Sequence, residues 1–198
     1  TGFVLKAINK AHPMVKITGT ELLEEGLEVA RKRVPEACLE QMDARKIDFS
    51  EKLGVVGAFD VLEHIPEDTI VLSNLFKAIR KGGGIVVTVP QHPQLWSPLD
   101  DASHHVRRYT RKELIAKVAS AGFKVDYVNS FVSLLVPLMW LSRKRKTSDW
   151  KEKPMVEFNL PPFFNKVLSL VMSIERILIR LGVNFPIGGS LLLVAKKP

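Results

Sequence analysis

Short apolar runs alternate with amphipathic helical segments along most of this chain, and that alternation constrains its fold more than any other feature. The most strand-like run is GIVVTVP at 84–90, and the segments between runs carry apolar residues at helical spacing. Since helices between strands serve as crossovers between parallel neighbours, the pattern predicts an α/β fold. Strands are expected at 15–20, 38–42, 54–59, 84–90, 123–128 and 191–197. After Pro66 a helix is expected to continue to Lys81, with Gly82 as its C-terminal cap.

Composition limits the class of protein. The 198 residues are 46% apolar, which is enough for one ordinary core and excludes disordered and collagen-like chains. Cys38 is the only cysteine and no signal-peptide pattern is present, so we expect a cytoplasmic protein. The net charge of +8 suits a phosphate, a nucleic acid or an anionic membrane, and does not choose among them.

Three carboxylates follow separate predicted strands. Glu21, Asp43 and Asp60 each stand at a carboxyl end, the edge where open α/β sheets bind their ligands. A carboxylate there can accept hydrogen bonds from ribose hydroxyls or from an adenine amine. Acidic residues at strand ends also cap helices, and for Glu21 alone capping is the more common role. The functional interpretation therefore depends on the series of acids.

Four ordered blocks carry a resemblance to a known family. They are GTELLEEGLEVARKR, MDARKIDF, GAFDVLEHIPED and LFKAIRKGGGIVVTVPQHP, and FDVLEHI followed by a helix and the KGGG turn is the most specific part. The series resembles class I S-adenosylmethionine-dependent methyltransferases, in the group that includes the quinone-biosynthesis methyltransferases. The resemblance implies a Rossmann-like three-layer αβα fold whose sheet is mostly parallel with an antiparallel last strand.

The resemblance also implies a cofactor, S-adenosylmethionine, and residues that would hold it. Glu21 would bind the ribose hydroxyls, Leu22 would also contact the cofactor, and Asp43 and Ala44 would meet the adenine. The wall near the methionine part would comprise Asp60, Val61 and Leu62. Thr1 and Gly2 look like the end of the family's glycine-rich loop, so we expect the rest of that loop and the first strand to precede this sequence.

Methyl transfer from a sulfonium is an in-line displacement in which the protein mainly aligns the methyl group and its acceptor. A base is needed only where the acceptor must lose a proton, and the candidates are His64, His92 and His104. A single histidine is more often an ordinary loop residue. As an alternative to a role as a base, an acidic substrate would be oriented by the basic residues of this loop, namely His104, His105, Arg107 and Arg108. No pair has the spacing of a metal site, so no metal is expected.

About sixty residues separate the last two predicted strands, far more than an ordinary connection. We therefore expect a methyltransferase domain at 1–130 and 190–198, and a helical insertion or lid at 131–189. The apolar stretch FVSLLVPLMWL precedes the basic cluster SRKRK, and an amphipathic helix is expected at 163–182. The insertion would either pack over the sheet or contact a membrane peripherally through 131–146.

The leading hypothesis is an enzyme that methylates a small-molecule or lipid-like acceptor. Two alternatives stay open: a nicotinamide-dependent oxidoreductase, since Glu21 would also suit the ribose of NAD, and a non-catalytic methyltransferase-like binding domain. A nucleic-acid substrate is not favoured, because the basic clusters are not interleaved with aromatic residues.

Overall fold

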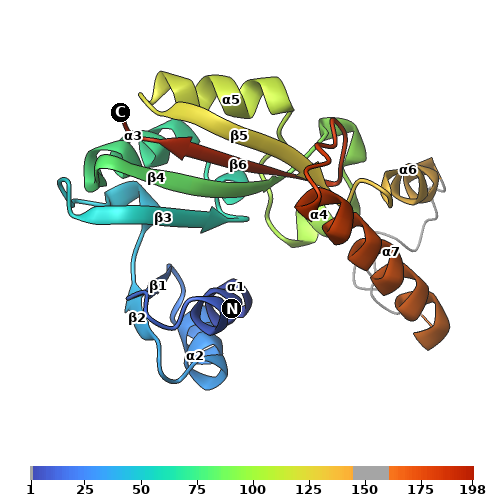
Figure 1. The fold of residues 1–198 in the computed structure, drawn as a ribbon, viewed down its shortest axis with the longest axis horizontal. Helices are drawn as coiled ribbons and strands as arrows, with labels where there is room; N and C mark the ends of the chain where they lie inside the picture. The colour runs from blue at the N-terminus through green and yellow to red at the C-terminus, as the bar shows by residue number, and fades with distance from the viewer. Residues whose placement is uncertain (1, 145–160) are drawn as a thin grey trace. The chain divides into compact units, whose positions relative to one another are not determined.

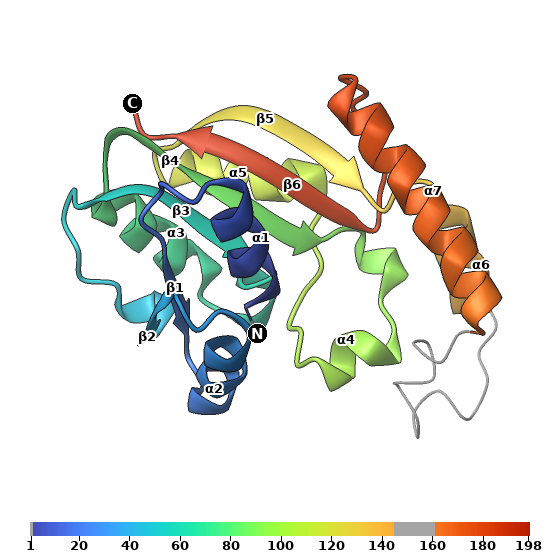
Figure 2. The same cartoon turned by 60° about the horizontal axis from the view of Figure 1, so that its bottom comes forward.

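The computed structural model describes residues 2–144 and 161–198 and divides the chain into two compact units, Thr1–Phe49 and Ser50–Pro198. Its helices and strands are drawn in Figure 1 and, from a second direction, in Figure 2. Each unit has its own sheet.

The first unit builds a two-stranded parallel sheet, in which Gly19 lies opposite Leu39. A Cβ atom added at Gly19 would lie 2.7 Å from the Leu5 side chain and 2.8 Å from that of Leu39. The missing side chain therefore lets the first helix pack closely on the sheet. The elements are α1 (Phe3–Ala11), β1 (Thr18–Glu21), α2 (Glu24–Arg33), β2 (Cys38–Gln41) and the short 3₁₀ helix η1 (Ala44–Lys46).

The second unit contains a four-stranded sheet in the order β3-β4-β6-β5. β4 runs parallel to β3, whereas β6 runs antiparallel to both β4 and β5 (Figure 1). The predicted α/β class and the antiparallel last strand are confirmed. The strands are β3 (Leu53–Phe59), β4 (Ile79–Pro90), β5 (Lys124–Phe131) and β6 (Ser190–Lys196).

The core of this unit lies between one face of the sheet and two helices that contact each other, α3 (Asp68–Ala78) and α5 (Arg111–Ser120). Alternate residues of the central strands supply that face: Val87 pairs with Leu193, and both are fully buried. The helices contribute fully buried residues to the same core, such as Leu72 and Leu114. Burial of each such side chain stabilises the fold by about 1.5–3 kcal/mol.

The predicted end of the helix after Pro66 was wrong. The helix ends at Ala78, and Ile79 already pairs with Leu53 of β3 as a buried strand residue. A Cβ atom at Gly83 would lie 2.2 Å from the Gly54 carbonyl oxygen, so the glycine turn lets the backbones of β3 and β4 approach. This long-range pairing overrides the helical pattern.

The remaining elements of the second unit lie in its connections. The segment 91–109, in which the sequence analysis predicted neither a helix nor a strand, contains a 3₁₀ helix, η3 (Pro93–Leu95), and a short helix, α4 (Pro98–Ala102). A further 3₁₀ helix, η2 (Leu62–His64), follows β3. Between β5 and β6 lie α6 (Val136–Lys144) and α7 (Pro162–Arg180), and α7 extends beyond the end of the sheet in both views (Figure 1, Figure 2). Within the described residues, no helix combines the length and the apolar character needed to cross a membrane.

Candidate functional site

Glu21 is the last residue of β1, as the sequence predicted. The cap of α2 is Leu23, with no side-chain hydrogen bond, so Glu21 does not cap that helix. Its carboxylate instead accepts a hydrogen bond from the Leu22 backbone N–H (2.9 Å) and lies over Gly26, where an added Cβ would sit 2.7 Å from Glu21 Cγ. The carboxylate is thus positioned beside α2 at the carboxyl end of its strand.

Asp43 follows β2 and caps η1, accepting a hydrogen bond from the Arg45 backbone N–H (2.9 Å). The Arg45 guanidinium also donates to both carboxylate oxygens, from Nε to Oδ1 (3.0 Å) and from Nη2 to Oδ2 (2.8 Å). Hydrogen bonds from Arg45 lower the pKa of Asp43 to about 2. An adenine amine at this position would therefore compete with Arg45. Ala44 begins η1 next to Asp43.

Gly2 begins α1 with a left-handed φ of 79° and lies against Ala30 of α2, where an added Cβ would come within 3.2 Å of the Ala30 backbone. Only glycine meets both conditions without strain. Thr1, the other residue predicted for the cofactor loop, lies outside the described residues.

Asp60 directly follows β3 and has a left-handed φ of 53°, a strained conformation for a residue with a side chain. Thr88 of β4 holds it there: the Thr88 hydroxyl donates to Asp60 Oδ1 (3.2 Å), and the Thr88 carbonyl accepts from the Asp60 N–H (3.0 Å). The turn leaves the carboxylate exposed, with Val61 half-buried and Leu62 fully buried. Of the three residues predicted to lie near the methionine part of the cofactor, Asp60 and Val61 are therefore accessible, and the Leu62 side chain belongs to the core.

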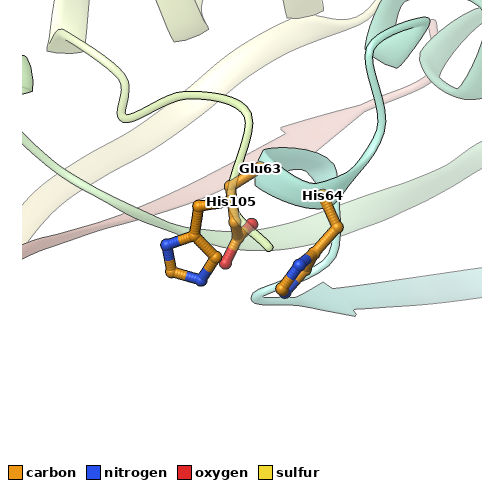
Figure 3. A group of neighbouring side chains, drawn as sticks. All are labelled: Glu63, His64 and His105. Atoms are coloured by element: carbon orange, nitrogen blue, oxygen red, sulfur yellow. The ribbon is translucent and has the colours of Figure 1, made fainter. Parts of the chain in front are cut away.

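A cluster that the sequence analysis did not identify lies directly after this turn. It comprises Glu63, His64 and His105, whose ligand atoms lie within 4.8 Å of one another (Figure 3). Glu63 is fully buried, and neither carboxylate oxygen has a hydrogen-bond partner among the described residues. Burial, together with the negative charges of Asp60 and Asp100, raises the pKa of Glu63 to about 8. Partial burial and the neighbouring His105 lower the pKa of His64.

Asp100, which is fully buried, orients this cluster from α4. Its Oδ1 atom lies 2.9 Å from His105 Nδ1 and also accepts from Arg108 Nε (2.7 Å), while Oδ2 accepts from the Ser97 N–H (2.8 Å). Burial alone would raise the pKa of Asp100, but hydrogen bonds from Arg108 and His105 outweigh it and lower the pKa. Because an ionised carboxylate can only accept, His105 carries a proton on Nδ1, and in the neutral tautomer of this ring the lone pair is on Nε2.

The hypothesis that Arg107 and Arg108 orient an acidic substrate is not supported. Arg107 forms an ion pair with the buried Asp68 (3.0 Å), and Arg108, whose side chain is 8% exposed, forms one with Asp100 (2.7 Å). Both guanidinium groups are already engaged in joining the 103–109 loop to its neighbours.

The candidate base histidines occupy different surroundings. His64 belongs to the cluster. His104 does not: it is exposed and directly precedes His105 on the same loop. His92 has a left-handed φ of 62°, and its buried Nε2 atom has no hydrogen-bond partner among the described residues. Burial and the nearby Arg108 charge lower the pKa of His92, so its ring is neutral near pH 7.

The sequence signal for the cluster was weak. Glu63 and His64 are adjacent in the FDVLEHI block, but His105 comes from a distant loop, and short-range spacing does not reveal that meeting. The burial of Glu63 is likewise a tertiary property.

Comparison with known proteins places this geometry in a family. A family model described as a methyltransferase domain matches residues 1–128. The phosphatidylethanolamine N-methyltransferase of Cereibacter sphaeroides is 38% identical over 80 residues, 37% of this chain and 39% of that protein. The trans-aconitate 2-methyltransferase of Azoarcus sp. (strain BH72) is 25% identical over 109 residues, 55% of this chain and 41% of that protein. The chain thus spans about two fifths of the length of these relatives.

The fold has solved counterparts. An S-adenosylmethionine-dependent methyltransferase from Mesorhizobium loti superposes with a TM-score of 0.62 at 14% identity, covering 98% of this chain and 86% of that one. This likeness shows the Rossmann-like methyltransferase fold, as predicted. The prediction of S-adenosylmethionine as the cofactor is confirmed at the level of the family. With its residues 1–128 matched, this chain belongs to the methyltransferase domain family.

Proposed function

We propose that this protein transfers the methyl group of S-adenosylmethionine to a small-molecule or lipid-like acceptor by in-line displacement. The observation that carries the proposal is the placement of Glu21, Asp43 and Asp60 at or just after the carboxyl ends of β1, β2 and β3, within the part of the chain that the methyltransferase domain matches. The same match favours methyl transfer over nicotinamide-dependent oxidoreduction.

Each acidic residue has a proposed role. Glu21 accepts hydrogen bonds from the ribose hydroxyls, and Gly2 and Leu22 are further cofactor-binding residues of the first unit. Asp43 and Ala44 contact the adenine.

The second unit supplies the remaining groups. Asp60 and Val61, with the Leu62 backbone, face the methionine part of the cofactor. The candidate groups for accepting a proton from the acceptor are His64, His92 and His104.

A calorimetric titration with S-adenosylhomocysteine tests the cofactor role. We expect micromolar binding by the wild type and a loss of about tenfold or more in Glu21→Ala, because charge-assisted hydrogen bonds contribute about 1.5–3 kcal/mol. Glu28→Ala, which removes an exposed carboxylate from the same unit, is the matched control and should bind like the wild type. No binding by the wild type would favour a non-catalytic methyltransferase-like domain instead.

A lipid-like acceptor is supported by one relative and by one helix. The Cereibacter sphaeroides relative is named for phosphatidylethanolamine. On α7 and at its C-cap, apolar residues recur every three or four positions and are exposed, from Phe163 (72%) through Leu170 (62%) to the cap residue Leu181 (76%). The acidic residue of this helix, Glu175, is buried and accepts a hydrogen bond from the Leu134 N–H (2.8 Å), whereas Lys166, Arg176 and Arg180 are exposed. An apolar stripe with exposed basic residues suits an anionic membrane interface.

We therefore propose that the 131–189 insertion, with α7 as its main contact, touches a membrane peripherally. The predicted contact at 131–146 is supported by exposed Leu138, Trp140 and Leu141 of α6, and its positions 145–146 lie outside the described residues. The predicted alternative, a lid packed over the sheet, would need the exposed stripe of α7 to be covered.

Co-sedimentation with vesicles of phosphatidylcholine and phosphatidylglycerol tests this contact. The wild type should bind, and the double variant Leu170→Glu, Ile174→Glu should lose about tenfold in binding or more, because each apolar side chain contributes about 1.5–3 kcal/mol when buried. Met14→Glu places a glutamate at a 95% exposed apolar residue outside the insertion and is the control. Equal binding by all three proteins would contradict the proposal.

A further inference from the structure

The buried carboxylate of Glu63 has no hydrogen-bond partner among the described residues, an arrangement that costs free energy unless something binds it. The group that would satisfy it must approach from the side of the two imidazoles, since the carboxylate of Glu63 points between His64 and His105 (Figure 3). A cation held jointly by the three side chains meets this condition.

The second sphere of the cluster has the arrangement found around metal-binding histidines. Asp100 Oδ1 lies 2.9 Å from His105 Nδ1, which fixes the tautomer and leaves Nε2 to coordinate. Asp100 is itself held by Arg108 and Ser97, and it is 1% exposed, so the His105 ring has a firm support. His64 stands beside His105, with ring centroids 4.8 Å apart.

We infer that Glu63, His64 and His105 form a binding site for a divalent transition-metal ion. Two imidazole nitrogens and one carboxylate suit Zn²⁺ and its neighbours in the first transition row rather than Ca²⁺ or Mg²⁺, which prefer oxygen ligands. Ligands around Zn²⁺ at about 2.1 Å stand about 3.4 Å apart in a tetrahedron. The ligand atoms here lie within 4.8 Å, and His64, which is exposed, can rotate inward to close the site.

Three protein ligands leave at least one coordination position open, as in catalytic rather than structural metal sites. The site directly follows the Asp60 turn on the chain. If the proposed methyl transfer holds, the open position would bind an oxygen or nitrogen of the acceptor; metal binding itself does not depend on that function.

The test is a titration of the chelator-treated full chain with Co²⁺ and with Zn²⁺, in the absence of any cofactor. Co²⁺ should give a visible absorption spectrum at one equivalent, and Zn²⁺ should displace it. Glu63→Gln and His105→Ala should each weaken binding about tenfold or more, because loss of an outer-shell partner alone typically costs about 10–100-fold in metal affinity and these variants remove a ligand itself. His104→Ala, at the neighbouring position on the same loop, should bind the metal like the wild type.

Glu63→Gln keeps the size of the side chain, and circular dichroism shows whether it remains folded. If the wild type takes up neither ion at micromolar concentrations, or if Glu63→Gln and His105→Ala retain full binding, the metal site is refuted. The titration with S-adenosylhomocysteine is a separate measurement made without added metal. Refutation of the metal site would therefore leave the proposed methyl transfer untouched, and failure of cofactor binding would leave the metal site untouched.

Discussion

Asp68→Ala is expected to lower the free energy of unfolding by about 2–4 kcal/mol, the largest stability effect we anticipate for a single polar side chain of this protein. Asp68, 2% exposed, accepts hydrogen bonds from the Tyr109 hydroxyl (2.7 Å), from Arg107 (3.0 Å) and from Lys117. Removing the carboxylate takes a shared buried acceptor away from two cations and a hydroxyl, although Lys117 keeps its ion pair with Glu113 and Arg107 its hydrogen bond to the Pro66 carbonyl. Because Lys117 and Arg107 are 20% and 26% exposed, water relieves part of the penalty. Urea unfolding measures the change.

The same contacts predict how this effect depends on pH. Burial alone would raise the pKa of Asp68, but hydrogen bonds from Lys117 and Tyr109 and the charges of Lys117 and Arg107 outweigh it and lower the pKa. A lowered folded-state pKa gives stability that is fully present above the ordinary value of 3.8 and is lost as the pH falls through the folded-state value. The difference between wild type and Asp68→Ala should therefore shrink in strong acid.

Glu67→Ala is the control for this prediction, since Glu67 is the exposed neighbour of Asp68. It should change stability by less than about 0.5 kcal/mol. A loss of similar size in both variants would mean that the network around Asp68 contributes nothing beyond ordinary helix-end charge. Tyr109 also donates to the Leu62 carbonyl (3.2 Å), so the network joins α3 and α5 to the segment that carries Glu63 and His64.

Gly26→Ala should weaken binding of S-adenosylhomocysteine about tenfold or more without weakening the fold. The added Cβ would stand 2.7 Å from Glu21 Cγ, 2.9 Å from Cδ and 3.0 Å from Oε2, so the carboxylate must move. The clash involves only a flexible side chain, and alanine is favoured over glycine in a helix by about 1 kcal/mol, so stability should be unchanged or higher. Calorimetry and urea unfolding on the same sample measure both effects.

A second glycine supplies the matched control. At Gly54 an added Cβ would meet nothing nearer than 3.6 Å, so Gly54→Ala should leave cofactor binding unchanged. Wild-type affinity in Gly26→Ala, with binding lost in Glu21→Ala, would mean that Glu21 binds the ribose from another rotamer. Unchanged affinity in both would show that the ribose role of Glu21 is wrong.

Local sequence patterns predicted most elements because those patterns act over a few residues. The alternation of strand and helix, and the acids at the ends of β1 and β3, follow from apolar periodicity and from chain order. The start of β4 was missed because Ile79 joins the sheet only through its pairing with Leu53, far away in the sequence. The α4 helix was missed because it is short and its capping residue, Ser97, lies within what looks like a polar loop.

By itself, the sequence determined the fold class, the family and the position of each acidic residue on its strand, because these depend on short-range order and motif spacing. Only the tertiary structure decided which charges are free to act. It engaged Arg107 and Arg108 in ion pairs, set Glu21 over Gly26, and buried Glu63 between two histidines from separate segments. Burial and partner choice depend on contacts between residues distant in the chain, and spacing alone does not encode those contacts.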